Sequence, residues 1–170
     1  RSGAVRKATW GQFSEGYERW IIPAENMKAD EKHEVPLPYA AQQLLETLSS
    51  DRQKDTDFVF TSSQTRMKMI SENTMSKALK QFYPDATVHG MRSAYRDWAE
   101  IFATARHEVK EAVLAHTNPN KVESAYLRTK YLDEREDLME VWGMWATGKD
   151  GTYEDLLNQH RIDRTTPTED

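Results

Sequence analysis

The sequence contains no cysteine, and that absence removes several kinds of chemistry. Without a thiol the chain can form no disulfide, no thiolate metal site and no cysteine nucleophile, so any nucleophile must be an oxygen or a nitrogen. The chain also lacks an apolar run of transmembrane length and a charged leader followed by an apolar stretch. We therefore expect a cytoplasmic protein that neither spans a membrane nor is secreted.

A net positive charge, which most nucleic-acid-binding domains carry, is missing as well. Acidic residues number 28 and basic residues 23, for a formal net charge of −5. The acids concentrate at one end, because residues 131–170 hold eleven of them against four bases. Residues 1–130 keep the other 17 acids and 19 bases, a net charge of +2, so the charge balance leaves DNA binding open.

Length and apolar periodicity predict one mostly helical α+β domain with a small antiparallel β-sheet. A chain of 170 residues can bury one core and is short for two domains. Short apolar runs predict strands at 8–13, 19–22 and 33–37, with a turn at 14–16 and an extended segment at 58–60. Apolar spacings of three and four predict helices at 39–48, 71–82, 89–103, 108–115, 121–128, 133–145 and 153–160, before a solvated tail at 161–170. We expect Trp98, Trp142 and Trp145 in the core rather than stacked on bases.

Residues suited to phosphate chemistry are dispersed along the chain rather than gathered in one compact motif. The set comprises Arg1, Lys28, His89, Arg92, His116 and Tyr126. Each has an ordinary structural reading when taken alone, such as a surface salt bridge for an arginine or a helix-end contact for a histidine. A metallohydrolase is a weak alternative, because no carboxylate stands at a ligand spacing with either histidine. The order and spacing of the whole set therefore carry the argument.

These residues lie in segments that together resemble the catalytic domain of tyrosine recombinases of the phage-integrase type, especially integrases of satellite phages and genomic islands. The matching segments are Arg1-Ser2-Gly3-Ala4-Val5-Arg6, Trp20 to Ala24 with Met27-Lys28 and Val35-Pro36-Leu37, His89-Gly90-Met91-Arg92-Ser93, Leu114-Ala115-His116, and Asn120 to Tyr126. One position departs from the family pattern, because Ala4 stands where an acidic residue usually follows the first arginine. The resemblance implies the tyrosine-recombinase catalytic fold, mostly helical around a small antiparallel sheet.

The resemblance also implies a role for each residue, which transition-state chemistry explains. Arg1 and Arg92 would clamp the non-bridging phosphate oxygens, because a guanidinium donates paired charge-assisted hydrogen bonds and stays protonated. Lys28 would act as the general acid for the departing 5′ oxygen. His116 would bond a non-bridging oxygen or assist that transfer, and His89 would orient the site or accept the tyrosine proton.

Tyr126 is the implied nucleophile, and it would store the phosphodiester energy in a 3′-phosphotyrosine. Rejoining then needs no ATP, no metal and no cofactor. Two of the assignments have a competitor of the same residue type, Lys32 for the loop lysine and Tyr131 for the nucleophile. The family pattern favours Lys28, and the local sequence around Tyr126, with Ala125 before it and Arg128 after it, favours that tyrosine.

The implied function is site-specific recombination, the integration or excision of a mobile element at double-stranded DNA attachment sites. We expect a monomer in solution and a homo-tetramer on DNA, with possible accessory DNA-bending proteins, in the bacterial cytoplasm at the nucleoid. We expect a catalytic domain at 1–147, a C-terminal segment at 148–170 whose residues 153–160 reach a neighbour, and further segments before Arg1. The alternatives are a type IB topoisomerase activity, an inactive DNA-binding remnant and a helical protein-interaction domain.

Overall fold

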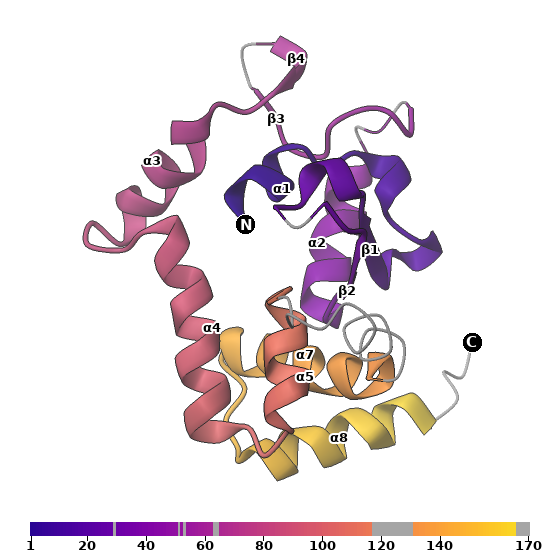
Figure 1. The fold of residues 1–170 in the computed structure, drawn as a ribbon, viewed down its shortest axis with the longest axis vertical. Coiled ribbons are helices and arrows are strands. Elements are labelled where there is room, and N and C mark those ends of the chain that lie inside the picture. The colour runs from indigo at the N-terminus through magenta and orange to yellow at the C-terminus, as the bar shows by residue number, and fades with distance from the viewer. Residues whose placement is uncertain (29, 51, 53, 63–64, 117–130, 166–170) are drawn as a thin grey trace.

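Helices make up most of the chain in the computed structural model, which describes residues 1–28, 30–50, 52, 54–62, 65–116 and 131–165 (Figure 1). The helices are α1 (Ser2–Arg6), α2 (Tyr39–Ser49), α3 (Glu72–Phe82), α4 (Val88–Phe102), α5 (His107–Val113), α7 (Leu132–Ala146) and α8 (Tyr153–Thr165). Strands β1 (Arg19–Ile22) and β2 (His33–Pro36) form one two-stranded antiparallel sheet, and β3 (Thr61–Ser62) and β4 (Thr65–Met69) form another. The predicted fold class, mostly helical α+β with a small antiparallel sheet, is confirmed.

The first of two apolar cores lies under the β1–β2 hairpin. In this hairpin Arg19 pairs with Pro36, and Ile22 pairs with His33. The core beneath it consists of Ala8, Trp10, Leu45 and Val59, with partly buried aromatic and leucine side chains packed around them. This packing fixes the hairpin, whose connection carries the predicted lysine, against α2.

The second core is built by the four helices α4, α5, α7 and α8. Its centre is Val109, Leu138 and Val141, each 0% exposed. The tryptophan rings pack in sequence beside it, with centroids 5.1 Å apart for Trp98 and Trp142 and 5.4 Å for Trp142 and Trp145. The core prediction is confirmed for Trp98 and Trp142, whereas the third ring is 42% exposed at the edge of the cluster.

Helix α7 joins the two cores, and Figure 1 shows it between α2 and α8. Arg135 on α7 is 1% exposed and donates a hydrogen bond to the backbone carbonyl of Glu34 in β2. Gly143 packs directly on Pro38 at the start of α2, where a Cβ on the glycine would lie 2.4 Å from the Cβ of the proline. The helical half is therefore held to the sheet by the buried cation of Arg135, and to the start of α2 by the close packing of Gly143 on Pro38.

Several predicted elements differ from the structure, each for a local reason. Residues 8–13 form no strand, because a 3₁₀ turn at Trp10–Gln12 interrupts them and leaves isolated bridges from Thr9 to Phe58 and from Phe13 to Trp20. The tail prediction was wrong for residues 161–165, which continue α8 and lie within it. The β3–β4 hairpin was not predicted, and the predicted helix at 121–128 lies outside the described residues.

Candidate active site

Arg92 on α4 is placed at the junction of α4 with the end of α5. The hydroxyl of Thr87 accepts a hydrogen bond from the backbone N–H of Gly90 at 2.9 Å, which caps α4 and fixes where the helix begins. Arg92 lies in the second turn, is half-buried, and donates a hydrogen bond to the carbonyl oxygen of Leu114, the residue that follows α5. The two helices are thus tied together by the side chain that the sequence predicts to bind phosphate.

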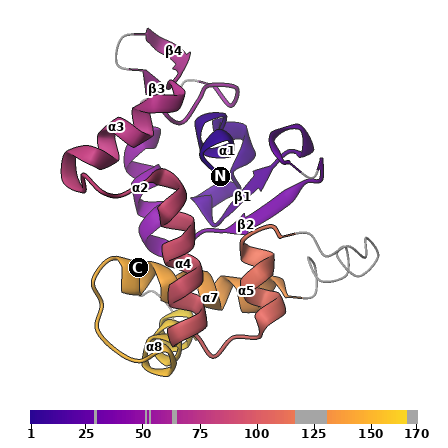
Figure 2. The same cartoon turned by 60° about the vertical axis from the view of Figure 1, so that its left-hand side comes forward.

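Arg1 adds a second positive charge beside Arg92. Figure 2 shows the N-terminus, where Arg1 precedes α1, next to α4. Burial lowers the pKa of Arg92, the charge of Arg1 lowers it further, Glu111 opposes this, and Arg96 adds to the lowering. A guanidinium stays protonated even so, and an anion bound beside it would offset both the burial and the charge of Arg1 that lower its pKa.

His116 stands just beyond α5, where the chain turns back on the helix. Ala115 takes the left-handed conformation with φ of 50°, and the backbone N–H of His116 then donates to the carbonyl of Glu111 at 3.2 Å. The same turn brings Nδ1 of His116 to 2.5 Å from the carboxylate Oε2 of Glu111. Burial alone would raise the pKa of Glu111, but the hydrogen bond and charge of His116, followed by the charge of Arg96, lower it below its ordinary value.

Five residues therefore form one group, which we call the arginine–histidine cluster: Arg1, Arg92, Arg96, Glu111 and His116. The carboxylate is its centre, because it bonds His116, lies 3.9 Å from Arg96 and acts electrostatically on Arg92. The cluster brings together three residues of the predicted set. Their catalytic roles stay predictions.

Sequence reasoning missed two members of the cluster, Glu111 and Arg96. The spacing of four between Arg92 and Arg96 places both on one face of α4, and this signal was readable. The position of Glu111, five residues before His116, was not, because that spacing joins two side chains only when the residue between helix and histidine turns left-handed.

Lys28 and His89, two other residues of the predicted set, are both exposed. Lys28 lies in the connection between β1 and β2, as does its competitor Lys32, and both are exposed. His89 lies in the first turn of α4, one turn before Arg92. In the described part of the chain, no hydrogen bond or ion pair joins Lys28 or His89 to the arginine–histidine cluster.

Tyr126 lies outside the described residues, whereas its competitor Tyr131 lies within them. Tyr131 immediately precedes α7, is 8% exposed and belongs to the second core. The guanidinium of Arg106 lies over its ring, 4.2 Å from the centroid. A nucleophile must reach a phosphate in solvent-accessible DNA, so this buried placement favours a core role for Tyr131.

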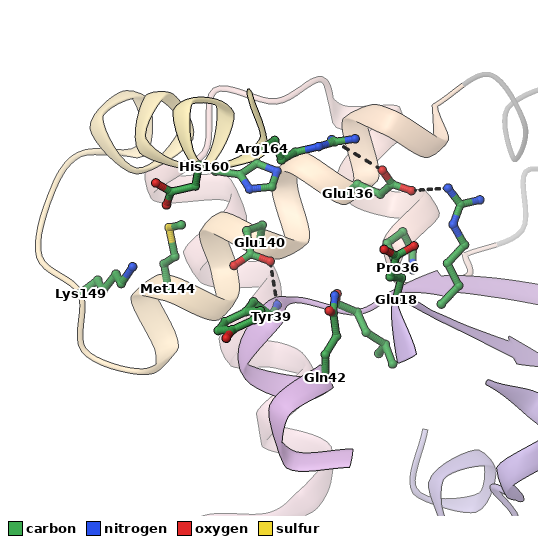
Figure 3. A pocket seen from close by; sticks show the side chains of 13 residues that line it. Glu18, Pro36, Tyr39, Gln42, Glu136, Glu140, Met144, Lys149, His160 and Arg164 are labelled. Atoms are coloured by element: carbon green, nitrogen blue, oxygen red, sulfur yellow. Dashed lines mark hydrogen bonds and ion pairs between the residues drawn. The ribbon is translucent and has the colours of Figure 1, made fainter. Parts of the chain in front are cut away.

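A cleft of about 600 Å³ is lined by the β1–β2 hairpin, the start of α2, one side of α7 and the second half of α8, and no residue of the arginine–histidine cluster lines it (Figure 3). Four of its lining residues are acidic: Glu18, Glu136, Glu140 and Asp163. Two of its three lysine and arginine side chains are paired with Glu136, Arg19 at 2.6 Å and Arg164 at 3.8 Å, and the third is Lys149. Because the acidic side chains outnumber the lysine and arginine side chains, this cleft suits a phosphodiester less well than the arginine–histidine cluster does.

The described residues offer no group of three or more histidine, aspartate or glutamate side chains that could hold a metal ion. In the same part of the chain no helix has the length and apolarity needed to cross a membrane.

Comparison with known proteins identifies the family of the chain. The model of the phage integrase family matches residues 1–132. The prophage integrase IntA of Escherichia coli strain K12 is 33% identical over 153 residues, which cover 84% of this chain and 34% of that protein. The integrase of Enterobacteria phage P4 is 29% identical over 92% of this chain and 39% of its own length, and the integrase of Shigella phage Sf6 is 29% identical over 88% and 39%.

The chain spans little more than a third of the length of these relatives. No solved structure was found to match it significantly. The family model covers more than three quarters of the 170 residues, from the first arginine to the start of α7. This chain belongs to the phage integrase family.

Proposed function

We propose that the chain carries out the chemistry of site-specific DNA recombination, in which Tyr126 cuts a strand and holds it as a 3′-phosphotyrosine. The observation that supports this most is the placement of Arg92, whose guanidinium is bonded to the carbonyl of Leu114 two residues before His116 and is acted on by the charge of Arg1. A helical protein-interaction domain gives no reason for the charge of Arg1 to act on Arg92 beside the turn that carries His116. A phosphodiester in its transition state gives that reason, because its oxygens gain negative charge.

The two arginines would bind the non-bridging oxygens of the scissile phosphate. Each guanidinium can donate two parallel charge-assisted hydrogen bonds, and neither loses its proton at any working pH. One N–H group of Arg92 already donates to the carbonyl of Leu114, and this bond fixes the side chain in the absence of DNA. Such a fixed donor needs no reorganisation during the reaction, and removal of one donor of this kind typically lowers a rate by about 10²–10³.

In the covalent step, the Oη atom of Tyr126 attacks phosphorus, and the bond from phosphorus to the 5′ oxygen breaks. Lys28 supplies the proton that the leaving 5′ oxygen needs, and His89 takes the proton of the phenol. A phenol has an ordinary pKa of about 10, and neighbouring cations favour its ionised form. Rejoining is the reverse reaction with the 5′ hydroxyl of another strand, so one phosphodiester is exchanged for another without ATP or a metal.

Tyr126 is preferred to Tyr131 as the nucleophile because of where Tyr131 lies. Its ring is packed in the second core under the guanidinium of Arg106, and the residue is only 8% exposed. Tyr126 follows His116 by ten residues in the segment that resembles the family's nucleophile box.

The proposed partners are double-stranded DNA attachment sites and other copies of the chain in a tetramer on that DNA. The proposed division is a catalytic domain at 1–147 followed by a C-terminal segment. In the structure this segment packs on its own chain, because Tyr153 and Leu156 join the second core and Arg161 binds Asp137 at 2.8 Å. Contact with a neighbour through α8 would require these bonds to be exchanged.

A trapped covalent intermediate tests the proposal. The chain is incubated with duplexes that carry a nick near the scissile phosphate, so that the cut fragment diffuses away and rejoining fails. After denaturation in detergent and nuclease digestion, mass spectrometry locates the residue that retains a 3′ nucleotide. Modification of Tyr126 supports the proposal, and nucleotide attached to any other side chain contradicts it.

A further inference from the structure

The hydrogen bond between Glu111 and His116 points to a role in the proposed reaction that the six-residue set does not include. We propose that Glu111 is a positioning residue, whose carboxylate holds Nδ1 of His116 and leaves Nε2 as the ring nitrogen available to a phosphate oxygen. This inference rests on the proposed function. It adds an acidic partner to a site otherwise made of cations and a tyrosine.

The contact is geometrically specific. Nδ1 of His116 lies 2.5 Å from Oε2 of Glu111, and the backbone N–H of His116 donates to the carbonyl of the same residue at 3.2 Å. A side-chain bond and a backbone bond to one residue fix both the position and the orientation of the imidazole. The left-handed Ala115 that closes this turn is strained for a residue with a Cβ, with φ of 50°.

An ionised carboxylate can only accept hydrogen bonds, so it selects the imidazole form with a proton on Nδ1. Free neutral imidazole side chains otherwise share the proton between the two nitrogens. With Nδ1–H bound to Glu111, a neutral His116 offers a lone pair at Nε2, and a protonated one offers an N–H donor there. Either form directs its chemistry through Nε2, as partner carboxylates of metal-binding histidines also arrange.

The charges around the pair favour the same conclusion. His116 stands among cations, since Arg92 is bonded to Leu114 two residues before it and Arg96 lies 3.9 Å from the carboxylate. A protonated imidazole beside these cations would be destabilised by their charge, and the carboxylate of Glu111 offsets that repulsion. The carboxylate of Glu111 is kept ionised, because contact with His116 and Arg96 outweighs the effect of burial and lowers its pKa.

The contact is more shielded from solvent than a neighbouring histidine–carboxylate pair. The side chain of Glu111 is 23% exposed and that of His116 is 37% exposed, so the contact is partly shielded. The nearby pair of Glu100 and His107 provides a comparison, because its carboxylate lies 3.6 Å from Nδ1 and both side chains are about half exposed or more. Replacement of Glu100 on α4 by alanine is therefore a control that removes a carboxylate from another histidine, together with its ion pair to Lys110 at 4.0 Å.

Nuclear magnetic resonance tests the geometry without DNA. Long-range proton–nitrogen correlation spectra of the histidine-labelled chain near pH 8, above the usual imidazole pKa of about 6.5, report which ring nitrogen carries the proton. We expect Nδ1–H for His116 in the natural chain and in Glu111→Gln, whose amide oxygen still accepts. Glu111→Ala should shift His116 towards Nε2–H, and Glu100→Ala should leave it unchanged. An Nε2–H form in the natural chain overturns the proposal.

A double-mutant cycle on the rate of covalent adduct formation tests the function. Glu111→Ala should slow the adduct by about 10–100-fold at saturating DNA, as loss of an outer partner typically does. If Glu111 acts through His116, the double variant with His116→Ala is no slower than His116→Ala alone, to within about 2-fold. If the rate loss of the double variant equals the product of the losses of the two single variants, Glu111 acts independently of His116, and the proposal fails.

The two proposals fail in different ways. If the natural chain gives no adduct, or Tyr126→Phe still gives one, the proposed function is wrong and the catalytic role of Glu111 falls with it. If the natural chain gives a Tyr126 adduct but the tautomer and the cycle disagree with the expectations above, only the positioning role is lost.

Discussion

Replacing Arg92 by methionine separates the catalytic role of this residue from its contribution to stability. The substitution keeps the apolar stem and removes the charge together with the bond to Leu114. Loss of a hydrogen bond from a charged donor costs about 1.5–3 kcal/mol. The fold also holds this cation against burial and against the charges of Arg1 and Arg96, as its lowered pKa shows, and the neutral side chain escapes that repulsion.

The two effects oppose each other, so Arg92→Met should change the free energy of unfolding by less than about 2 kcal/mol. The rate of adduct formation should fall by about 10³, because a fixed donor to the transition state is gone. The contrasting variant is Arg19→Met. Burial alone would lower the pKa of Arg19, but its bond to Glu34 and the charge of Glu136 raise it.

Arg19→Met should therefore destabilise the fold, by about 1 kcal/mol for a half-exposed ion-pair network, and leave the adduct rate within a few-fold of the natural value. Urea unfolding followed by tryptophan fluorescence measures the stability, and single-turnover trapping on nicked duplexes measures the rate. The reasoning is refuted if Arg92→Met keeps the natural rate, or if its rate loss is matched by loss of folded protein under assay conditions.

Three further predictions concern packing and pH. Gly143→Ala should destabilise the chain by about 1–3 kcal/mol, because its Cβ would overlap Pro38. Gly3→Ala has open space around it and should stabilise α1 by up to about 1 kcal/mol. Thermal unfolding should therefore show a lower Tm for the first variant and an equal or higher Tm for the second, and a Gly143→Ala chain as stable as the natural one would contradict the packing. Leu138→Ala, at the 0% exposed centre of the second core, should cost about 2–5 kcal/mol in urea unfolding, and a cost under about 1 kcal/mol would contradict the core. The pKa of Glu111 is lower in the folded chain than in the unfolded chain, so its contribution to the free energy of unfolding is complete above about pH 4.3 and is lost as the pH falls through the folded pKa. Glu111→Gln should therefore weaken the dependence of stability on pH in the acid range. An unchanged dependence would contradict the lowered pKa.

Sequence patterns predicted well the elements whose apolar spacing is compatible with only one type of secondary structure. The β1–β2 pair follows from two apolar runs with a polar connection, and α4 follows from Met91, Tyr95, Trp98 and Phe102 at helical spacing. Residues 8–13 failed because a short aromatic run fits either a strand or a buried turn, and Trp10 enters the first core from a turn.

Other elements escaped prediction because distant contacts decide them. The final turn of α8 is polar, and its Arg161 and Arg164 bind the acidic face of α7, which periodicity along one segment cannot reveal. The approach of Arg1 to Arg92 could be expected from the family resemblance, since the two lie in separate boxes. The contact of Glu111 with His116 could not, because it depends on the backbone of a single alanine.

The identity of the nucleophile tests the central claim most directly. The natural chain, Tyr126→Phe and Tyr131→Phe are incubated in parallel with nicked duplexes from mobile-element and genomic DNA, and detergent-resistant protein–DNA adducts are counted. We predict an adduct in the natural chain and in Tyr131→Phe, whose ring lies in the second core, and none in Tyr126→Phe. An adduct that persists in Tyr126→Phe, or that disappears only in Tyr131→Phe, would contradict the proposed mechanism.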